Sequence, residues 1–530
     1  MTLLKCEPNY KIFFGDNETF TLSTDLATMK DEITRWEGHD GYSRYLAWLR
    51  ESHEHYELSV THVLLKNFTS LKSMLRLDFL SHLLALHPFE SIWGRASRYF
   101  WTERLRRVFT FGSMYMGMSP FDAPGTYSLL QYTELAEGIW YPVGGFHRVV
   151  QALVEVGERL GVVYRLGTGV EKIVLTADGS RATGVRLEGG EVLTADVVVN
   201  NSDLVYAYEN LLPKTPYAES LARRPASCSS ISFYWALDRK VPELNAHNIF
   251  LADEYKESFD SIFKKHLIPD QPSFYVNVPS RVDPSAAPQG KDSVVVLVPV
   301  GHLLDSTPSD SSTPSDPTTT TISSASPKNQ PGILPTSTQD WPAMLSLARR
   351  TILATIASRT GADLTPLILH EQTNTPRTWL TNFNLSQGAI LGLSHSFFNV
   401  LSFRPSTRAR RGGWLDGKLG GGLVGRVGEL VGDVGRGSGR DIRGLYMVGA
   451  SVHPGTGVPI CLAGGKLVAE QVCQDLGVRV PWIVGPKEER VGRRGKLDRE
   501  DAEVVSWEWV AAFVGLLLAL LFAFVVGRSW

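Results

Sequence analysis

Apolar residues in the first third of the chain recur at helical rather than alternating intervals. Residues 25–37 and 42–58 carry apolar positions every three to four residues, and the apolar-rich stretch 64–86 continues this spacing. Aromatic and methionine side chains then cluster between residues 99 and 118. Such side chains suit a cavity for a long apolar ligand, and an ordinary core has the same composition. We therefore expect residues 1–135 to be mainly helical.

The apolar pattern changes near residue 140. A turn with two consecutive glycines leads into a helix over 149–160, where apolar residues again repeat at helical intervals. Three runs rich in β-branched residues follow at 170–175, 182–187 and 192–199, which predicts a three-stranded meander. Three consecutive valines in the last run predict a strand that is buried on both faces of a parallel sheet.

Mixed α/β patterns fill the middle of the chain. Residues 231–237, 274–278 and 294–298 are typical of strands, and Asp340 is a suitable N-cap for a following helix. Residues 303–339 consist mainly of Ser, Thr, Pro and Asp. We expect a disordered loop there, because little apolar surface is available to offset the entropy of ordering.

A second insertion, residues 406–440, is rich in glycine. It contains the pattern GGGLVG at 420–425, which matches GxGxxG literally. No strand precedes this pattern, and further glycines follow where a helix would begin, so we assign no dinucleotide to it.

A strand at 445–448 is followed by the glycine-rich loop 449–459 and then by a helix over 461–476. A loop of this kind presents free N–H groups together with the positive end of the helix dipole. This arrangement stabilises a phosphate or the N1/C2 carbonyl edge of a reduced flavin. The alternative, a plain tight turn, explains one or two of the glycines but not the whole pattern.

The composition narrows the possible partners and chemistry. The chain has 530 residues and balances 53 Lys and Arg against 55 Asp and Glu, with a formal net charge of -2, so nucleic acid is an unexpected partner. It has four cysteines and no CxxC pair, which favours a reducing compartment and no metal site. The length fits two or three domains.

The last residues are typical of a membrane anchor. Residues 507–527 form a largely apolar segment flanked by tryptophans, and its uncharged core is just long enough to cross the bilayer as a helix. Basic residues are concentrated in the preceding linker, 481–506, which predicts a single-pass tail anchor with a cytosolic body on the endoplasmic reticulum or another internal membrane. A buried core helix is the alternative.

The run from Val448 to Pro459 resembles the C-terminal flavin-binding signature of phytoene desaturases of the bacterial and fungal carotenoid type, within the flavin amine oxidase superfamily. Further segments support the resemblance, most closely to the fungal branch: 109–111, 114–120, 123–127, 137–142, 144–146 and 402–405. Apart from the two insertions, the similarity covers most of residues 1–480.

The resemblance implies an α/β fold of the FAD-dependent amine-oxidase type, followed by the C-terminal transmembrane helix. It divides the body into a helical substrate and membrane-proximal region (1–135), two segments of a Rossmann-type FAD domain (136–205 and 441–480) and a mixed α/β substrate domain (206–405). FAD is the implied cofactor, with NAD as the alternative. The implied cofactor-binding residues are Gly449, Ala450, Ser451, Gly455, Thr456, Gly457, Val458, Gly144, Gly145 and Val170. No catalytic residue stands out, and His453 is a weak candidate because a histidine before proline in a turn is more often structural.

The family opens with a strand, a GxGxxG turn and a helix that hold the FAD pyrophosphate, and we expect this first βαβ unit to be missing from the sequence given. By resemblance, the protein dehydrogenates phytoene stepwise towards lycopene or more desaturated products by hydride transfer to FAD. Phytoene, other carotenoid intermediates, membrane lipid and other carotenoid-pathway enzymes are the implied partners. A non-catalytic remnant that binds apolar lipid is one alternative, and a related carotenoid isomerase or retinol saturase is another.

Overall fold

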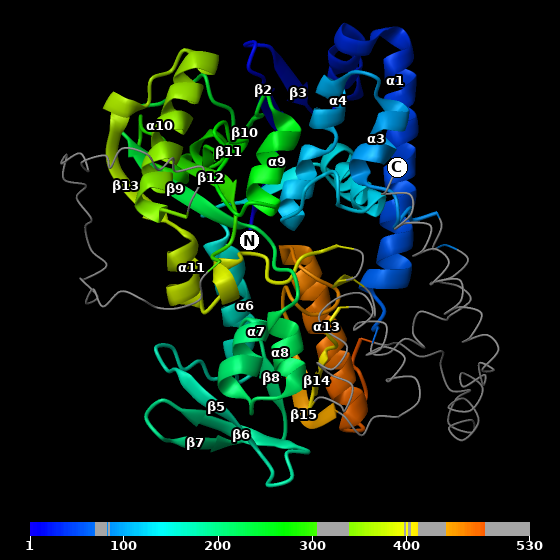
Figure 1. The fold of residues 1–530 in the computed structure, drawn as a ribbon, viewed down its shortest axis with the longest axis vertical. Helices are drawn as coiled ribbons and strands as arrows, with labels where there is room; N and C mark the ends of the chain where they lie inside the picture. Colours follow the sequence, from blue (N-terminus) through cyan, green and yellow to red (C-terminus); the bar gives the residue numbers. More distant parts are fainter. Residues whose placement is uncertain are drawn as a thin grey trace.

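Seven strands form the largest sheet of the computed structural model, which describes residues 1–68, 82, 85–304, 339–396, 399–400, 404–411 and 441–482. The sheet lies in the upper part of the molecule, and two three-stranded sheets lie below it (Figure 1). Its strands, in spatial order, are β13 (Ile368–Asn374), β9 (Ser229–Leu237), β12 (Ser293–Val300), β11 (Phe274–Asn277), β10 (His247–Phe250), β2 (Tyr10–Phe13) and β3 (Thr19–Leu22). Neighbours are antiparallel except β10 and β2, which run parallel.

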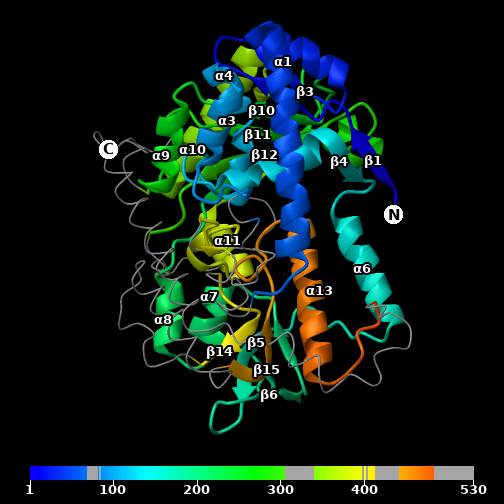
Figure 2. The same cartoon turned by 90° about the vertical axis from the view of Figure 1, so that its right-hand side faces the viewer.

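Helix α1 (Leu26–Ser59) covers one face of this sheet and continues downward past it (Figure 2). Asp25 caps its first turn by accepting hydrogen bonds from the N–H groups of Ala27 and Thr28. The two helices predicted at 25–37 and 42–58 are therefore confirmed, and they join at Gly38, where a φ of 69° interrupts the helical backbone. Smaller helices complete this layer: α3 (Ile92–Tyr99), α4 (Glu103–Val108), α5 (Leu129–Tyr132) and α9 (Tyr255–Phe263).

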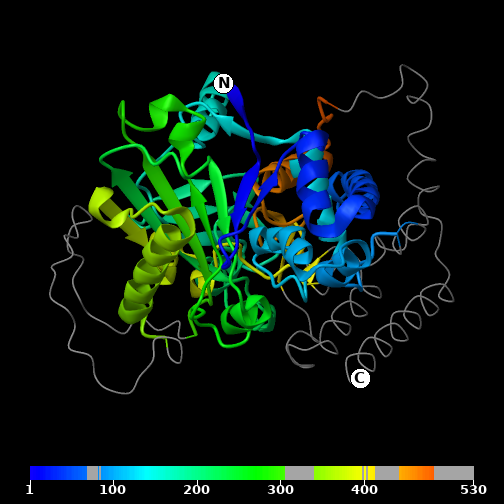
Figure 3. The ribbon, with the colours of Figure 1, turned by 90° about the horizontal axis from the view of Figure 1, so that it is seen from above.

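Helix α10 (Trp341–Thr360) covers the opposite face, so the sheet is sandwiched between helical layers (Figure 3). Asp340 is its N-cap, as the sequence predicts, and accepts a hydrogen bond from the Ala343 N–H. Ile231, Phe233 and Trp235 alternate along β9 and pack into the same core as this helix. Helix α11 (Pro376–Phe383) follows β13.

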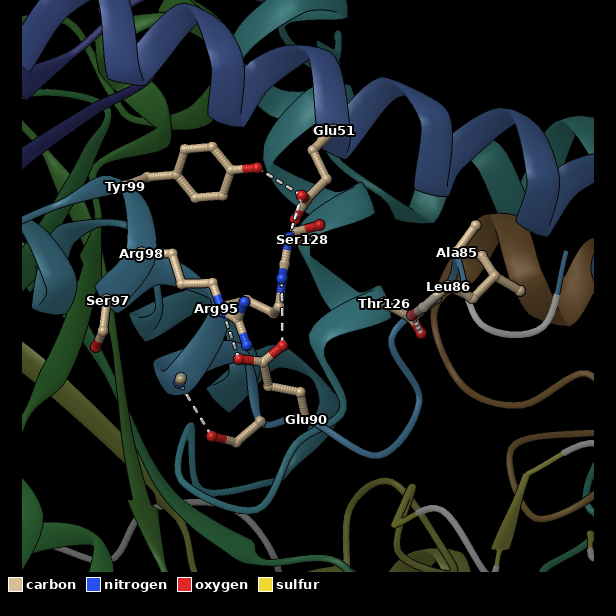
Figure 4. Close-up of polar contacts among 12 residues, drawn as sticks. Glu51, Ala85, Leu86, Glu90, Arg95, Ser97, Arg98, Tyr99, Thr126 and Ser128 are labelled. Atoms are coloured by element: carbon tan, nitrogen blue, oxygen red, sulfur yellow. Dashed lines mark hydrogen bonds and ion pairs between the residues drawn. The ribbon is translucent and has the colours of Figure 1, made fainter. Parts of the chain in front are cut away.

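A buried ion network ties α1 to α3 (Figure 4). The Arg95 guanidinium forms an ion pair with Glu51 and a second one with Glu90 at 3.2 Å, while the Tyr99 hydroxyl donates to Glu51 at 2.6 Å. His55 lies beside them; its Nε2–H donates to the Ala85 carbonyl and its Nδ1 accepts from the Ser128 hydroxyl. Glu51, His55 and His87 bring possible metal-ligand atoms within 4.8 Å of one another. Because Glu51 and His55 already use these atoms in the network, we interpret the group as structural.

The N-terminal residues depart from the mainly helical expectation for 1–135. Strand β1 (Leu3–Cys6) pairs with β4 (Ile139–Pro142), and β2 and β3 extend the large sheet. Each of these strands has four residues, which is too short for a clear alternating pattern.

The lower part contains the predicted meander, with one correction. Strands β5 (Val170–Leu175), β6 (Ala182–Leu187) and β7 (Val192–Thr194) form it. The third predicted run divides, because β8 (Val198–Asn200) leaves the meander and pairs in parallel with β15 (Asp441–Met447). The expectation that this run is buried on both faces is wrong, since Val199 is 48% exposed. Strand β14 (Arg408–Arg410) lies on the other side of β15.

Helix α6 (His147–Arg159) confirms the helix predicted after residue 140 and stands at the edge of the lower part, which also contains α13 (Val458–Asp475) (Figure 2). Its apolar residues Val150, Leu153 and Val156 are exposed. Within the described ranges, no side chain of α6 is buried. Short helices α7 (Leu204–Tyr206) and α8 (Pro216–Ala222) complete this part.

Several predicted segments lie largely or wholly outside the described residues. They are most of the loop 303–339, most of the glycine-rich insertion 406–440, nearly all of the basic linker 481–506 and the whole predicted transmembrane segment 507–527. Across the part of the chain that the structure describes, no helix has both the length and the apolar character needed to span a bilayer.

Candidate functional site

The loop between β15 and α13 is the centre of the candidate site. Strand β15 pairs with β8 so that Leu445 lies opposite Val198, and the Val448 N–H donates to the Asn200 carbonyl just beyond the paired residues. The predicted strand, loop and helix are all present, and the helix begins at Val458, three residues earlier than expected. The loop therefore leaves the carboxyl end of a parallel strand, where ligands bind in sheets of this kind.

Three glycines give the loop a backbone that other residues rarely adopt. The φ angles of Gly449, Gly455 and Gly457 are 124°, 132° and 105°. A Cβ at Gly455 would lie 3.2 Å from Nε2 of His395, whereas a Cβ at Gly457 would meet only Ile460, at 3.7 Å. One side of the loop is thus packed against protein, and the side at Gly457 is open.

The open side presents hydrogen-bond donors. Gly457 is the N-cap of α13 and contributes no side chain to it. Among the described residues, no acceptor is bound to the N–H groups of Gly457 and Val458, and both residues are exposed. Unpaired N–H groups at a helix N-terminus attract negative charge. A flavin fits this chemistry, with Gly455, Thr456, Gly457 and Val458 as the residues that would hold it.

The packed side of the loop contains a buried arginine. Arg404 is 3% exposed, and all of its N–H groups point at acceptors. These acceptors are the carbonyls of Val452 (3.1 Å), Asn399 (2.7 Å), Ser394 (3.4 Å) and Ala450, and Nε2 of His395 (3.0 Å). Burial lowers the pKa of Arg404 to about 10, so the guanidinium remains charged at neutral pH.

His395 connects this arginine to the loop. Its Nε2 accepts from Arg404 and also from the Thr456 N–H at 3.3 Å, which requires an unprotonated Nε2 and places the ring proton on Nδ1. Burial and the neighbouring Arg404 charge hold the pKa of His395 well below its usual range, so the ring is neutral. The sequence motif that contains Arg404 was part of the resemblance, but neither residue was predicted as a site residue.

The remaining predicted loop residues have structural contacts. The Ser451 hydroxyl accepts from the Leu393 N–H at 3.0 Å, and the Ala450 carbonyl accepts from Arg404. His453 is 1% exposed; its Nε2 bonds the Lys66 carbonyl at 2.8 Å and its ring lies 5.0 Å from that of Phe68. These contacts favour the structural role of His453 over the catalytic one.

Gly144, Gly145 and Val170 lie on other elements. The two glycines form the turn between β4 and α6 with φ near 80°, and the Gly144 N–H donates to Asp283 at 2.7 Å. Val170 opens β5 and pairs with Leu187. These bonds explain the turn and the strand, and the assignment of the three residues to a cofactor remains a prediction.

A buried carboxyl group, which the sequence did not reveal, lies below the large sheet. Glu134 Oε1 accepts from the Tyr10 hydroxyl at 3.2 Å, and its buried Oε2 has no partner among the described residues. The rings of Phe111 and Tyr115 lie 5.6 and 6.5 Å from that of Tyr10. Burial raises the pKa of Glu134 to about 8, so the carboxyl holds a proton at neutral pH.

We expect the free energy of unfolding to fall as the pH rises from 6.5 to 8. The folded state keeps the Glu134 proton up to about pH 8, whereas the unfolded chain loses it near pH 4.5, so ionisation opposes folding between these values. Relative to Glu134→Gln, the wild type should lose about 2 kcal/mol of unfolding free energy between pH 6.5 and 8. Denaturant unfolding at half-unit pH steps measures this difference.

The range from pH 6.5 to 8 lies above the pH at which two buried histidines affect stability. Their effect has the opposite sign to that of Glu134. Burial lowers the pKa of His55 and of His247 to about 4, so their contribution to stability is lost as pH falls below about 6.5. The exposed Glu137 serves as control, and Glu137→Gln should follow the wild type. Parallel pH curves for wild type and Glu134→Gln would contradict the assignment.

Comparison with known proteins agrees with this geometry. Residues 58–313 match the family model described as flavin containing amine oxidoreductase. A phytoene desaturase from Cercospora nicotianae is 69% identical over 98% of this chain and 85% of that protein. One from Fusarium fujikuroi is 56% identical over 98% of this chain and 84% of that protein. A zeta-carotene-forming phytoene desaturase from Myxococcus xanthus is 35% identical over 89% of this chain and 79% of that protein.

The α/β architecture, the strand–loop–helix site and the family model together define a flavoprotein oxidoreductase with an amine-oxidase-like fold, and FAD is the cofactor of this class. Within that class, the identity to fungal relatives over nearly the whole chain is decisive. The chain belongs to the phytoene desaturase family.

Proposed function

We propose that this chain is a carotenoid desaturase that dehydrogenates phytoene stepwise towards lycopene or more desaturated products. The family is one of oxidoreductases acting on CH–CH groups. The observation that carries the proposal is the open end of the loop at Gly457 and Val458. Their N–H groups have no acceptor among the described residues, and the buried Arg404 guanidinium contacts the same loop. A hydrocarbon substrate brings no charge, so this electropositive loop suits the cofactor rather than the polyene.

The protein's own residues position the cofactor, stabilise its negative charge and exclude water from the substrate. FAD held at this loop would supply the acceptor for a hydride from an allylic carbon of the polyene, while a proton leaves the neighbouring carbon and a C=C bond forms. The N–H groups of Gly457 and Val458 are placed to donate to an anionic edge of the ring. Phe111, Met116 and Met118 are buried in the helical region, and they are the apolar side chains that we propose lie beside the long flexible chain and exclude water from it.

Membrane association is part of the proposal and is supported by the sequence alone. Residues 507–527 provide an apolar segment, and the basic linker 481–506 predicts a cytosolic body. Phytoene is itself apolar and dissolves in bilayers, so an enzyme held at a membrane surface meets its substrate directly. Other carotenoid-pathway enzymes are proposed partners at the same surface.

Expression in cells that accumulate phytoene tests the function. Because the resemblance implies a GxGxxG segment ahead of the matched region, two versions are compared: the chain as given and the chain preceded by a strand–GxGxxG–helix segment. We expect coloured, more conjugated products by chromatography in at least one version. Protein in the membrane fraction, and its loss when the chain ends at Ser506, would support the anchor.

The possible results separate the alternatives. Unchanged phytoene in both versions, with both proteins expressed, would overturn the desaturase proposal and favour a non-catalytic lipid-binding relative. Carotenoid isomers or saturated retinoids formed from supplied substrates, without new conjugation, would instead indicate an isomerase or a saturase.

A further inference from the structure

Arg404 carries a buried positive charge that no described residue balances. Among the described residues, no carboxylate lies within ion-pair distance of its guanidinium, and the groups that affect its charge most are Tyr127, Arg224 and Cys461. A buried charge without an opposite partner is costly, even when carbonyl dipoles solvate it. Such a charge indicates that an anion belongs nearby.

Arg408, four residues later, provides the contrast. Its guanidinium lies 2.6 Å from the Asp475 carboxylate and is partly exposed, so its charge is balanced within the chain. The two arginines of this short segment therefore differ: a carboxylate balances the charge of Arg408, and no described carboxylate balances that of Arg404. Arg404 is the one that bonds the loop 449–459.

The contacts of Arg404 also determine which way the loop faces. Arg404 binds the carbonyls of Ala450 and Val452 from the inner side, and through His395 it fixes the N–H of Thr456. The inner side of the loop is thereby filled. The N–H groups of Gly457 and Val458 remain on the open side, and no described residue accepts a hydrogen bond from them.

We propose that Arg404 is the positioning residue of the flavin site: it holds the loop so that the N–H groups of Gly457 and Val458 face outward. Its unbalanced positive charge also favours the reduced, anionic cofactor over the oxidised one. The inference rests on the proposed flavin-dependent function and assigns a role to a residue outside the predicted site. The proposed substrate is a neutral hydrocarbon, so the cofactor is the anion that this charge serves. All Arg404 donors are used within the protein, so Arg404 acts through the loop and through its electric field.

Binding of FAD in its two redox states tests the proposal. Dissociation constants of the full chain are measured by anaerobic equilibrium dialysis with oxidised FAD and with dithionite-reduced FAD. We expect Arg404→Gln to weaken the binding of oxidised FAD about tenfold, because the loop is no longer held in place. The binding of reduced FAD should weaken about a hundredfold, because the positive charge is lost as well. Arg404→Lys keeps the charge without the fork of donors, so it should weaken both forms by a similar factor.

Arg408→Gln is the control for this experiment. Arg408→Gln should leave both dissociation constants within about twofold of wild type, because Asp475 already balances that charge. Equal weakening of both redox forms by Arg404→Gln would overturn the electrostatic role. If Arg404→Gln does not fold, a changed ratio of the two constants in Arg404→Lys overturns it instead. Wild-type protein that binds neither form, both as the chain given and when preceded by the GxGxxG segment, would overturn the proposed cofactor use itself.

Discussion

Replacement of Gly455 by valine should reduce FAD binding at least about a hundredfold. The backbone φ of 132° is strained for any other residue, which costs about 1–3 kcal/mol. The new Cβ would also lie 3.2 Å from Nε2 of His395 and displace the ring from its bonds to Arg404 and Thr456. The two effects together approach 3 kcal/mol, which is about a hundredfold in affinity. Equilibrium dialysis against oxidised FAD measures the loss.

Gly465→Ala is the matched control on the following helix. A Cβ there meets nothing within 4 Å, and the residue is helical, so alanine should stabilise α13 by about 0.5–1 kcal/mol. Its FAD affinity should remain close to wild type. Gly455→Val protein that folds and binds FAD as tightly as the control would show that the flavin lies elsewhere.

Replacement of Arg95 by methionine should lower the free energy of unfolding by about 3–5 kcal/mol. It leaves the largely buried Glu51 carboxylate without its cation, while the Tyr99 hydroxyl alone remains as donor. Chemical denaturation followed by circular dichroism measures the change. Adding Glu51→Gln to the same variant should recover part of the loss, because the unpaired charge is then removed.

Arg98→Met is the control for this network. Arg98 contacts the same Glu90 at 2.9 Å, but its side chain is 64% exposed, so its removal should cost less than about 1 kcal/mol. Equal losses for Arg95→Met and Arg98→Met would contradict the importance assigned to burial.

The sequence predicted those parts of the fold that depend on local periodicity. Helix α10 with its N-cap Asp340, the meander, and the strand–loop–helix unit around Gly455 all follow from the spacing of residues that are close together in the sequence. The short strands near the N-terminus escaped prediction because four residues are too few for a clear alternating pattern. Part of their pairing is also distant: Ile12 of β2 lies opposite Ile249 of β10.

The sequence predicted the glycine-rich loop of the candidate site but not the residues that pack behind it. The glycines of loop 449–459 are visible in the sequence because they are close together and follow a strand. Arg404 and His395 reach this loop from outside it, and no spacing rule links them to Ala450 or Thr456. The motif containing Arg404 was noticed as a resemblance, but its role required knowledge of which carbonyls face it. Glu134 and Tyr10 are likewise brought together only by the tertiary fold.

Helix α1 has a mechanical consequence for the two parts of the molecule. From Gly38 onward it runs about 30 Å as a continuous rod, and the residues just beyond it bond the lower part: Lys66 to His453 and Asn67 to Thr407. Any movement of the lower part relative to α1 must break these bonds, which lie beside the candidate site. The loop 449–459 is therefore tied directly to the chain that leaves α1, through His453.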